Sequence, residues 1–342
     1  MSSIAWLSHT LDDGRIACDA CNQECKLFEG EYGICGVRKV ENAQMHLLTY
    51  GRAATVNVGS IEKKPLFHFL PDSDVFSFGT VGCNLSCKFC QNPDISQYPK
   101  EHHNTILGHK LSPQRALNLA IENGCQSIAY RYNEPVVFFE YTYDTAKLAY
   151  EAGLNNIYVS SGYETRKAID TILPFLDGMN IDIKGYNESF YKDICGSSLK
   201  PVLETLDYAY QKGIWIETST LLIPGCNDSD QEIRDIAKFQ ASLDPNIPWH
   251  ISTYNNARYK MQNTSKTPQE TLTRAYDIAK EVGLNYVYTD TMNDMLREST
   301  YCPHCDKSVI DRHSRERNYV TNHLSSKGQC PWCGTDIAGV WF

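Results

Sequence analysis

Three closely spaced cysteines are the most distinctive chemical motif in the chain. The stretch GCNLSCKFC begins at Gly82 and places thiols at Cys83, Cys87 and Cys90, with the spacing C-x3-C-x2-C. Cysteine thiolates are the usual ligands of [4Fe-4S] clusters, and such a cluster has four irons. Three local thiolates therefore leave one iron without a protein ligand, where a substrate or a cofactor can bind.

A closed zinc site is the competing interpretation of this triplet. Structural zinc takes four protein ligands in a tetrahedron, and no cysteine or histidine close to the triplet supplies the fourth. Cys125 or Cys195 could do so from elsewhere in the chain. We expect these two and Cys226 to be packing or loop residues, and the open cluster is the preferred interpretation.

Two further groups of four cysteines lie near the ends of the chain. Two C-x2-C knuckles of the kind that enclose tetrahedral zinc lie near the C-terminus, at Cys302, Cys305, Cys330 and Cys333. The N-terminal group, with unequal spacing, consists of Cys18, Cys21, Cys25 and Cys35. Ligand type alone does not separate zinc from an auxiliary [4Fe-4S] cluster there, and zinc is only slightly favoured.

The elements that position the triplet follow a repeated β-α pattern from about residue 75 to 290. Short β-branched or aromatic runs alternate with amphipathic stretches of helical period. The predicted strands are Val75–Thr80, Ser127–Tyr132, Asn156–Ser160, Met179–Lys184, Ile214–Ile223, Trp249–Tyr254 and Asn285–Asp290. Six or seven such units predict an α/β fold, a partial or full (β/α) barrel with its chemistry at the C-terminal ends of the strands.

Capping residues and glycines support these helix boundaries. Ser112-Pro113 and Thr267-Pro268 each place a capping hydroxyl before a proline suited to the first helical turn. Glycines that can close a helix in the left-handed conformation precede four strands, at Gly124, Gly153, Gly213 and Gly283.

The composition changes at both ends of the β-α region. Residues 1–60 are predicted to form a Cys-rich N-terminal subdomain with a strand pair around Met45 to Val58. Residues 61–298 form the barrel, and residues 299–342 form a zinc-ribbon-like C-terminal subdomain.

Bulk composition limits the class of protein. The 342 residues are 42% hydrophobic, and the net charge of -9 comes without a Lys/Arg block, so nucleic acid and anionic membranes are not expected partners. No signal sequence or long apolar segment is evident, and fourteen cysteines in a reducing compartment suit metal ligands. We expect a cytoplasmic protein.

The triplet, with an aromatic residue before its last cysteine, resembles the signature of radical S-adenosylmethionine (SAM) enzymes. Five further motifs extend the resemblance over nearly the whole chain: IEKKPL from Ile61, YNEP from Tyr132, DIKG from Asp182, IPGCND from Ile223 and PWH from Pro248. The pattern is similar to enzymes related to pyruvate formate-lyase activating enzymes, and more narrowly to the radical SAM protein of the AmmeMemoRadiSam system.

The resemblance implies a mechanism and its cofactors. SAM chelates the open iron of a [4Fe-4S] cluster, an electron cleaves its sulfonium, and a 5'-deoxyadenosyl radical abstracts a hydrogen atom. An external electron donor such as flavodoxin or ferredoxin is implied. The expected target is a protein, a peptide or a glycyl-radical enzyme. A small-molecule substrate and a non-catalytic metal-knuckle binding module are the alternatives.

The resemblance also assigns residues around SAM. Asn133 and Glu134 occupy the place of a loop that cradles the methionine amino group, with Glu134 as its acceptor; an ordinary turn before a helix is the alternative. Asp182 and Lys184 point to one side of a strand end, and Lys184 resembles the partner of the SAM carboxylate unless it is a surface lysine.

Weaker candidates lie at two other predicted strand ends. Ser160, Ser161 and Gly162 could approach the methionine or the ribose. His250 is placed near the adenosine or the substrate, although a lone histidine is often structural.

Overall fold

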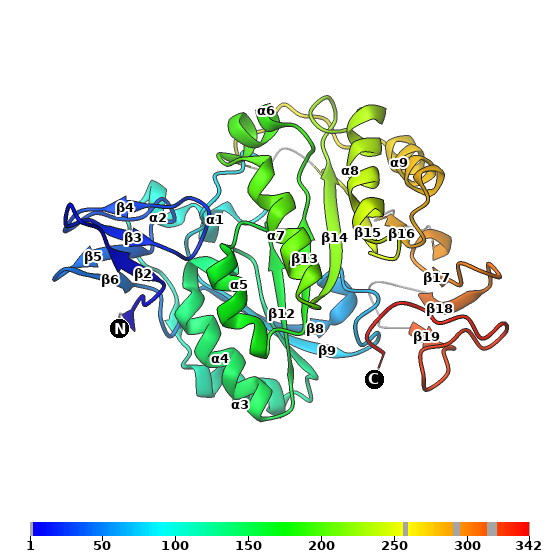
Figure 1. Ribbon diagram of the computed structural model, residues 1–342, viewed down its shortest axis with the longest axis horizontal. Coiled ribbons are helices and arrows are strands. Elements are labelled where there is room, and N and C mark those ends of the chain that lie inside the picture. The colour runs from blue at the N-terminus through cyan, green and yellow to red at the C-terminus, as the bar shows by residue number, and fades with distance from the viewer. Residues whose placement is uncertain (1–2, 256–258, 290–294, 313–319, 342) are drawn as a thin grey trace.

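The computed structural model describes residues 3–255, 259–289, 295–312 and 320–341, and one eight-stranded sheet forms its centre (Figure 1). The strands follow the order β16-β15-β14-β13-β12-β11-β9-β8. Their bounds are β8 (Thr55–Ser60), β9 (Asp74–Gly79), β11 (Ser127–Tyr130), β12 (Asn155–Ser160), β13 (Gly178–Asp182), β14 (Trp215–Leu222), β15 (Trp249–Thr253) and β16 (Val287–Thr289). All the predicted strands are present; Asp290 lies outside the described residues.

The sheet is a partial barrel, as predicted. Strands β9 to β16 pair in parallel, whereas β8 pairs antiparallel with β9 at one edge. Within the described ranges no pairing joins β8 to β16, so the barrel stays open between its two edge strands.

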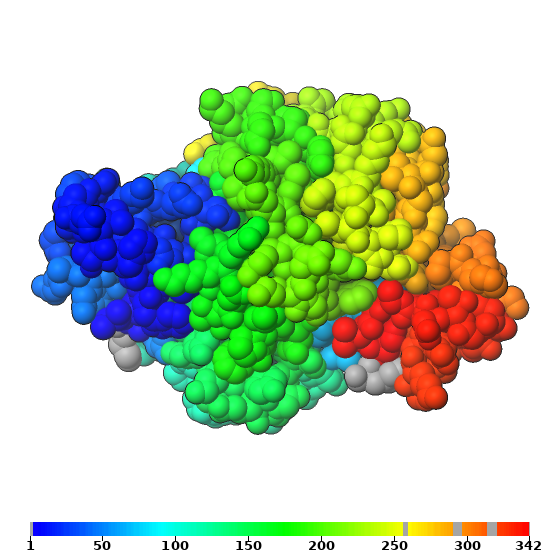
Figure 2. All heavy atoms as spheres, in the orientation of Figure 1, coloured from blue at the N-terminus to red at the C-terminus, as the bar shows by residue number. Residues whose placement is uncertain are grey.

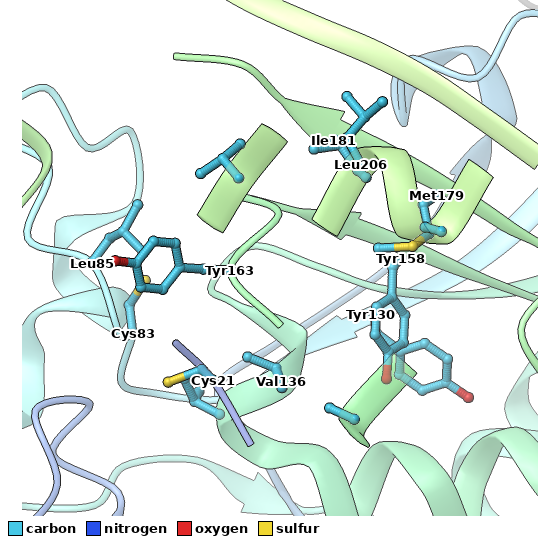
Figure 3. Close-up of a cluster of buried hydrophobic side chains, with 14 of the residues drawn as sticks. Cys21, Cys83, Leu85, Tyr130, Val136, Tyr158, Tyr163, Met179, Ile181 and Leu206 are labelled. Carbon is cyan, nitrogen blue, oxygen red and sulfur yellow. The ribbon is translucent and has the colours of Figure 1, made fainter. Parts of the chain in front are cut away.

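Helices cover one face of the sheet (Figure 1). They are α3 (Pro113–Glu122), α4 (Phe139–Glu151), α5 (Arg166–Ile172), α7 (Leu199–Gln211), α8 (Asp230–Leu243) and α9 (Gln269–Val282). Each buries one apolar stripe, as α7 does with Val202 and Leu206. Figure 3 shows part of the resulting core, with Tyr130, Tyr158 and Met179 from neighbouring strands. Shorter helices are α1 (Pro93–Ser96), α2 (Tyr98–Glu101) and α6 (Glu188–Phe190).

The two predicted helix starts have different outcomes. Ser112 caps α3 by accepting from the Arg115 amide at 3.2 Å. Thr267 was expected to cap the last helix, but Pro268 is the N-cap residue of α9. The Thr267 hydroxyl instead accepts from Tyr254 N at 2.8 Å and donates to Leu222 O at 2.6 Å. The Thr267 hydroxyl therefore links the backbone at the ends of two strands, and a local sequence motif does not reveal such a long-range contact.

The N-terminal residues form two small antiparallel sheets. One contains β1 (Ser3–Ile4), β5 (Arg38–Glu41) and β6 (Gln44–Leu47), and the other contains β2 (Ser8–Thr10), β3 (Ile16–Cys18) and β4 (Lys26–Leu27). The predicted strand pair around Met45 to Val58 is wrong, because β6 pairs with β1 and β5 while β8 joins the main sheet. Between them, β7 (Arg52–Ala53) pairs with β10 (His109–Lys110).

The segment Ile61–Leu70, which we call the floor segment, crosses the barrel near the N-terminal ends of its parallel strands. We call this the lower end of the barrel. Glu217 of β14 is fully buried, and its carboxylate accepts from Phe67 N at 2.9 Å and His68 N at 2.8 Å. Asn180 of β13 donates to a floor carbonyl at 2.7 Å. These bonds satisfy backbone groups that would otherwise be buried without partners.

The C-terminal residues pack against the floor segment and β16. Their sheet consists of β17 (Thr300–Tyr301), β18 (Ser308–Arg312) and β19 (Val320–Asn322). Arg312 donates to Phe67 O at 2.6 Å, and Val340 exchanges backbone hydrogen bonds with the floor. The N-terminal and C-terminal parts thus lie at opposite ends of the molecule (Figures 1 and 2).

We predict that Glu217→Gln lowers the free energy of unfolding by about 1.5–3 kcal/mol or more, because a charged acceptor of several buried donors is lost. Chemical denaturation measures this change. The control is Glu281→Gln, which alters an exposed pair with Arg234 and is expected to cost less than about 1 kcal/mol. Equal losses in both variants would contradict the anchoring role of Glu217.

Candidate active site

The cysteine triplet lies in the loop after β9, at the C-terminal end of the strands. Gly82 begins this loop at φ +90°, and an added Cβ would lie 2.7 Å from Cys35 O, so only glycine suits the position. Asn133 holds the loop: its Oδ1 accepts from Thr80 N at 3.1 Å and its Nδ2 donates to Gly82 O at 2.7 Å. The Asn133 amide therefore positions the cysteine loop.

One cavity of about 650 Å³ brings the predicted site residues together. It lies inside the barrel between the cysteine loop and the floor segment. Its walls include ten predicted residues: Cys83, Cys87, Cys90, Asn133, Glu134, Ser160, Ser161, Asp182, Lys184 and His250. Gly162 is not among the lining residues, because it packs against Ile181 and Val202.

The three thiols are largely withdrawn from solvent. Burial raises the pKa of Cys83 to about 12, and the neighbouring Cys195 thiol together with burial raises the pKa of Cys87. Cys90 Sγ lies 3.0 Å from Ser96 Oγ. Since thiolates must form for a metal to bind, loading of this site involves loss of protons.

The spacing of the thiols distinguishes the two interpretations of the triplet. Among the described residues, the triplet does not form a group of three ligand atoms within 4.8 Å of one another, as a single zinc ion requires. Cys125 lies near Asp74, at the opposite end of β9, whereas Cys195 adjoins Cys87. The donor set therefore fits an iron-sulfur cluster, whose thiolates bind different irons.

A buried carboxylate lies beside the thiols in the same cavity. Glu134 accepts from Ser160 Oγ at 2.7 Å and from Ser161 N at 2.8 Å. Burial raises its pKa despite these bonds. Ser160 also lies 2.6 Å from Glu164, and burial followed by the Glu134 charge raises the pKa of Glu164 to about 8. A cationic ligand at Glu134 would offset the cost of burying this charge.

The opposite charge comes from the end of β13. Lys184 Nζ lies 2.7 Å from Asp182 Oδ2. Burial disfavours its charged form, but Asp182 and the Cys87 thiol outweigh burial and raise the pKa of Lys184. The cavity thus holds a cation and a carboxylate from the loops that follow β13 and β11, which fits the carboxylate and ammonium of an amino acid.

His250 occupies a different position from the one predicted. It was expected at the end of its strand, but it is the second residue of β15 and lies at the floor of the cavity. Its Nε2 lies 2.7 Å from Glu217 Oε2. Burial alone would raise the pKa of Glu217, but His250, His68 and the Phe67 amide together lower it. Phe67 packs edge-on against its ring. The cavity lining retains His250 as a candidate contact for a substrate.

Several lining residues were not predicted. They come from the floor, the strands and the C-terminal part, and include Phe67, Arg131, Asn180, Ser219 and Arg312. Glu217, which supports the floor from behind the lining, could have been identified from the sequence. A carboxylate within a strand of apolar and hydroxyl residues needs a buried partner. Arg312 gives no such signal, because only the tertiary fold brings β18 to the barrel.

The C-terminal quartet of cysteines is tightly gathered. Cys302 and Cys333 have their sulfurs 3.6 Å apart, and Cys305 and Cys330 have theirs 3.7 Å apart. All four sulfurs lie within 4.8 Å of one another. This spacing is that of a tetrahedron around one ion with metal-sulfur bonds of about 2.3 Å.

Comparison with known proteins gives consistent matches. Residues 78–239 match the radical SAM superfamily. The uncharacterized protein MJ0808 of Methanocaldococcus jannaschii is 38% identical over 96% of both chains. The pyruvate formate-lyase-activating enzyme of Clostridium pasteurianum is 23% identical over 59% of this chain and 88% of its own.

A solved structure shares the fold. Streptococcus suis SuiB bound to precursor peptide SuiA superposes with a TM-score of 0.51 at 15% identity, over 68% of this chain and 52% of SuiB. Among the described residues, no helix has the length and apolarity required to cross a membrane.

We predict that Glu164 makes stability fall as pH rises. The native carboxyl keeps its proton until about pH 8, whereas the unfolded chain releases it near 4.5. Unfolding therefore releases a proton within this window, and the free energy of unfolding decreases with pH. Thermal denaturation across the window is expected to show a shallower decrease for Glu164→Gln. The exposed Glu122→Gln variant serves as control, and identical slopes for all three proteins would refute the assignment.

Proposed function

Because the chain belongs to the radical SAM superfamily, we propose that this enzyme uses SAM and a [4Fe-4S] cluster at Cys83, Cys87 and Cys90 to abstract hydrogen from a protein or peptide. The observation that carries this proposal is the shared cavity. It combines three thiols with a buried carboxylate and a buried ammonium of the charges that the amino-acid end of SAM requires.

The chain's own residues bind and orient the cofactors. With both groups bound, one electron cleaves the SAM sulfonium and yields the 5'-deoxyadenosyl radical that abstracts hydrogen. The Glu134 carboxylate accepts hydrogen bonds from the SAM ammonium. The Ser160 hydroxyl and the Ser161 amide hold the Glu134 carboxylate in place. Lys184 binds the SAM carboxylate, with Asp182 fixing its direction.

The floor of the cavity excludes water from the reacting centre. The Glu217 carboxylate holds the backbone at Phe67 and His68, and the Phe67 ring covers His250. We assign His250 to the substrate or adenosine side of the cavity. A dry, rigid wall protects a reactive species from side reactions.

A protein or peptide substrate, including a glycyl-radical enzyme, is supported by the relative that is named for activating pyruvate formate-lyase. A small molecule is the second candidate, and the cavity of about 650 Å³ could hold one beside SAM. We further propose membership of the AmmeMemoRadiSam system, a cytoplasmic location and a flavodoxin or ferredoxin as electron donor. We do not retain the alternative of a non-catalytic metal-knuckle binding module, because the chain belongs to a superfamily of enzymes.

We also propose that the C-terminal cysteine quartet binds a structural zinc ion, which the tight spacing of its sulfurs supports. The division of the chain at residues 60 and 298 remains a prediction.

We expect the anaerobically reconstituted enzyme to form 5'-deoxyadenosine and methionine from SAM when a low-potential reductant is added. Replacing Cys83, Cys87 or Cys90 by Ala should abolish this product in a chromatographic assay, because each removes a cluster ligand. Cys226→Ala is the matched control and should retain it. Undiminished cleavage in any triplet variant would show that the ligand assignment is wrong.

Glu134→Gln and Lys184→Met should each weaken SAM binding about tenfold or more, since a charge-assisted hydrogen bond of about 1.5–3 kcal/mol is lost. Equilibrium binding to the reconstituted enzyme measures the affinity, and iron analysis should give the wild-type value. Controls are the exposed replacements Glu122→Gln and Lys192→Met. Wild-type affinity in both test variants would assign these residues a structural role.

A further inference from the structure

We propose that the N-terminal cysteine quartet holds a second [4Fe-4S] cluster, ligated by four thiolates and closed to SAM. The quartet consists of Cys18, Cys21, Cys25 and Cys35, which line one small cavity in the N-terminal part. The proposal does not depend on SAM cleavage. It concerns a site distinct from the triplet, because none of these four residues lines the catalytic cavity.

The quartet is assembled from several short elements. Cys18 ends β3, Cys25 precedes β4 and Cys35 precedes β5, while Cys21 forms a β-bridge with Glu164. Three of the thiols belong to buried residues, and Cys25 is half-buried. Gly33 lines the same cavity, where an added Cβ would lie in van der Waals contact with Cys35 Sγ at 3.6 Å and Cys25 Sγ at 3.8 Å.

The spacing of the thiols argues against a single zinc ion. In the described part of the chain, only the C-terminal quartet brings three or more such ligand atoms within 4.8 Å of one another. No three of the N-terminal thiols meet this criterion, and the catalytic triplet does not meet it either. A zinc ion binds four sulfurs at about 2.3 Å, whereas a cubane binds each thiolate at a different corner. The N-terminal arrangement therefore favours a cluster over a single zinc ion.

A buried amide lines the same cavity. Asn84 is fully buried, and its side-chain amide faces the Cys21 thiol, while its Nδ2 makes no hydrogen bond of regular geometry among the described residues. A buried N-H group without a good acceptor is costly, and sulfur atoms of a cluster accept such bonds. Asn84 thus provides a buried donor beside Cys21 that a cluster would satisfy.

The surrounding charge suits thiolates. Arg38 also lines the cavity, and its buried guanidinium lies near Cys18 and Cys35. A bidentate pair with Glu140, at 2.7 and 3.2 Å, holds the guanidinium in position. A fixed cation favours the deprotonated ligands that either metal centre requires.

The proposed cluster lies next to the catalytic triplet. Gln23 Nε2 donates to Asn84 O at 2.8 Å, and Cys83 Sγ lies 3.8 Å from Asn84 Oδ1. The Cys35 carbonyl packs against Gly82. Figure 3 shows Cys21 and Cys83 in the same part of the buried core. Asn84 therefore belongs to the surroundings of both sites.

The test removes the catalytic cluster and leaves the quartet intact. The full chain carrying Cys83→Ala, Cys87→Ala and Cys90→Ala is reconstituted anaerobically with iron and sulfide, and its metals are analysed. We expect about four irons and four sulfides per chain. Reduction with dithionite should add one electron and give a paramagnetic signal that SAM does not change. Wild-type protein should contain about twice this amount of iron.

A chain without iron, or with a second zinc in its place, would overturn the proposal. Adding Cys18→Ser and Cys21→Ser to the triple variant should remove the remaining iron, whereas adding Cys125→Ser and Cys226→Ser should not. Retention of the C-terminal metal and an unchanged circular dichroism spectrum verify folding. In an otherwise wild-type chain, Cys25→Ser should lower cluster content while the SAM-responsive signal persists. If the wild-type enzyme failed to cleave SAM but the quartet still held iron, the proposed function would be contradicted and the second cluster would not.

Discussion

The buried carboxylate of Glu217 is the interaction on which the geometry of the cavity depends. It satisfies two backbone amides of the floor segment and contacts His250. A charge with no exposed surface is costly unless several donors surround it. Here those donors belong to the floor, to β15 and to Trp215 on its own strand. One residue thus closes the lower end of an open barrel and fixes the depth of the site.

The upper end of the cavity also contains a buried carboxylate, but there the protein does not fully satisfy its charge. Glu134 receives only neutral donors, and burial leaves its carboxylate short of positive charge. Lys184 is held by Asp182 yet still lines the cavity. The lower carboxylate is fully engaged within the protein, while the upper groups keep binding capacity for a ligand. This difference separates the residues that build the cavity from those proposed to bind in it.

The sequence was most informative where chemistry and periodicity are local. The cysteine triplet, the strands and ten of the residues that line the cavity could be predicted, because each rests on local motifs. The strand of His250 was predicted to begin at Trp249, as it does, so the error lies in assigning His250 to the C-terminal end of that strand. Thr267 failed as a cap because its hydroxyl bonds to distant backbone. The contribution of Arg312 could not be predicted, since its partners lie far away in the chain.

The attachment of the C-terminal part has a consequence for how such an enzyme can diversify. Glu298, Arg312 and Val320 form part of the cavity wall although they lie outside the main sheet. The residues proposed to hold SAM and the catalytic cluster all belong to the sheet and its loops. Exchange or divergence of the C-terminal segment alone would reshape the wall without disturbing the cofactor positions. Selectivity and reactivity can thus evolve as separate modules.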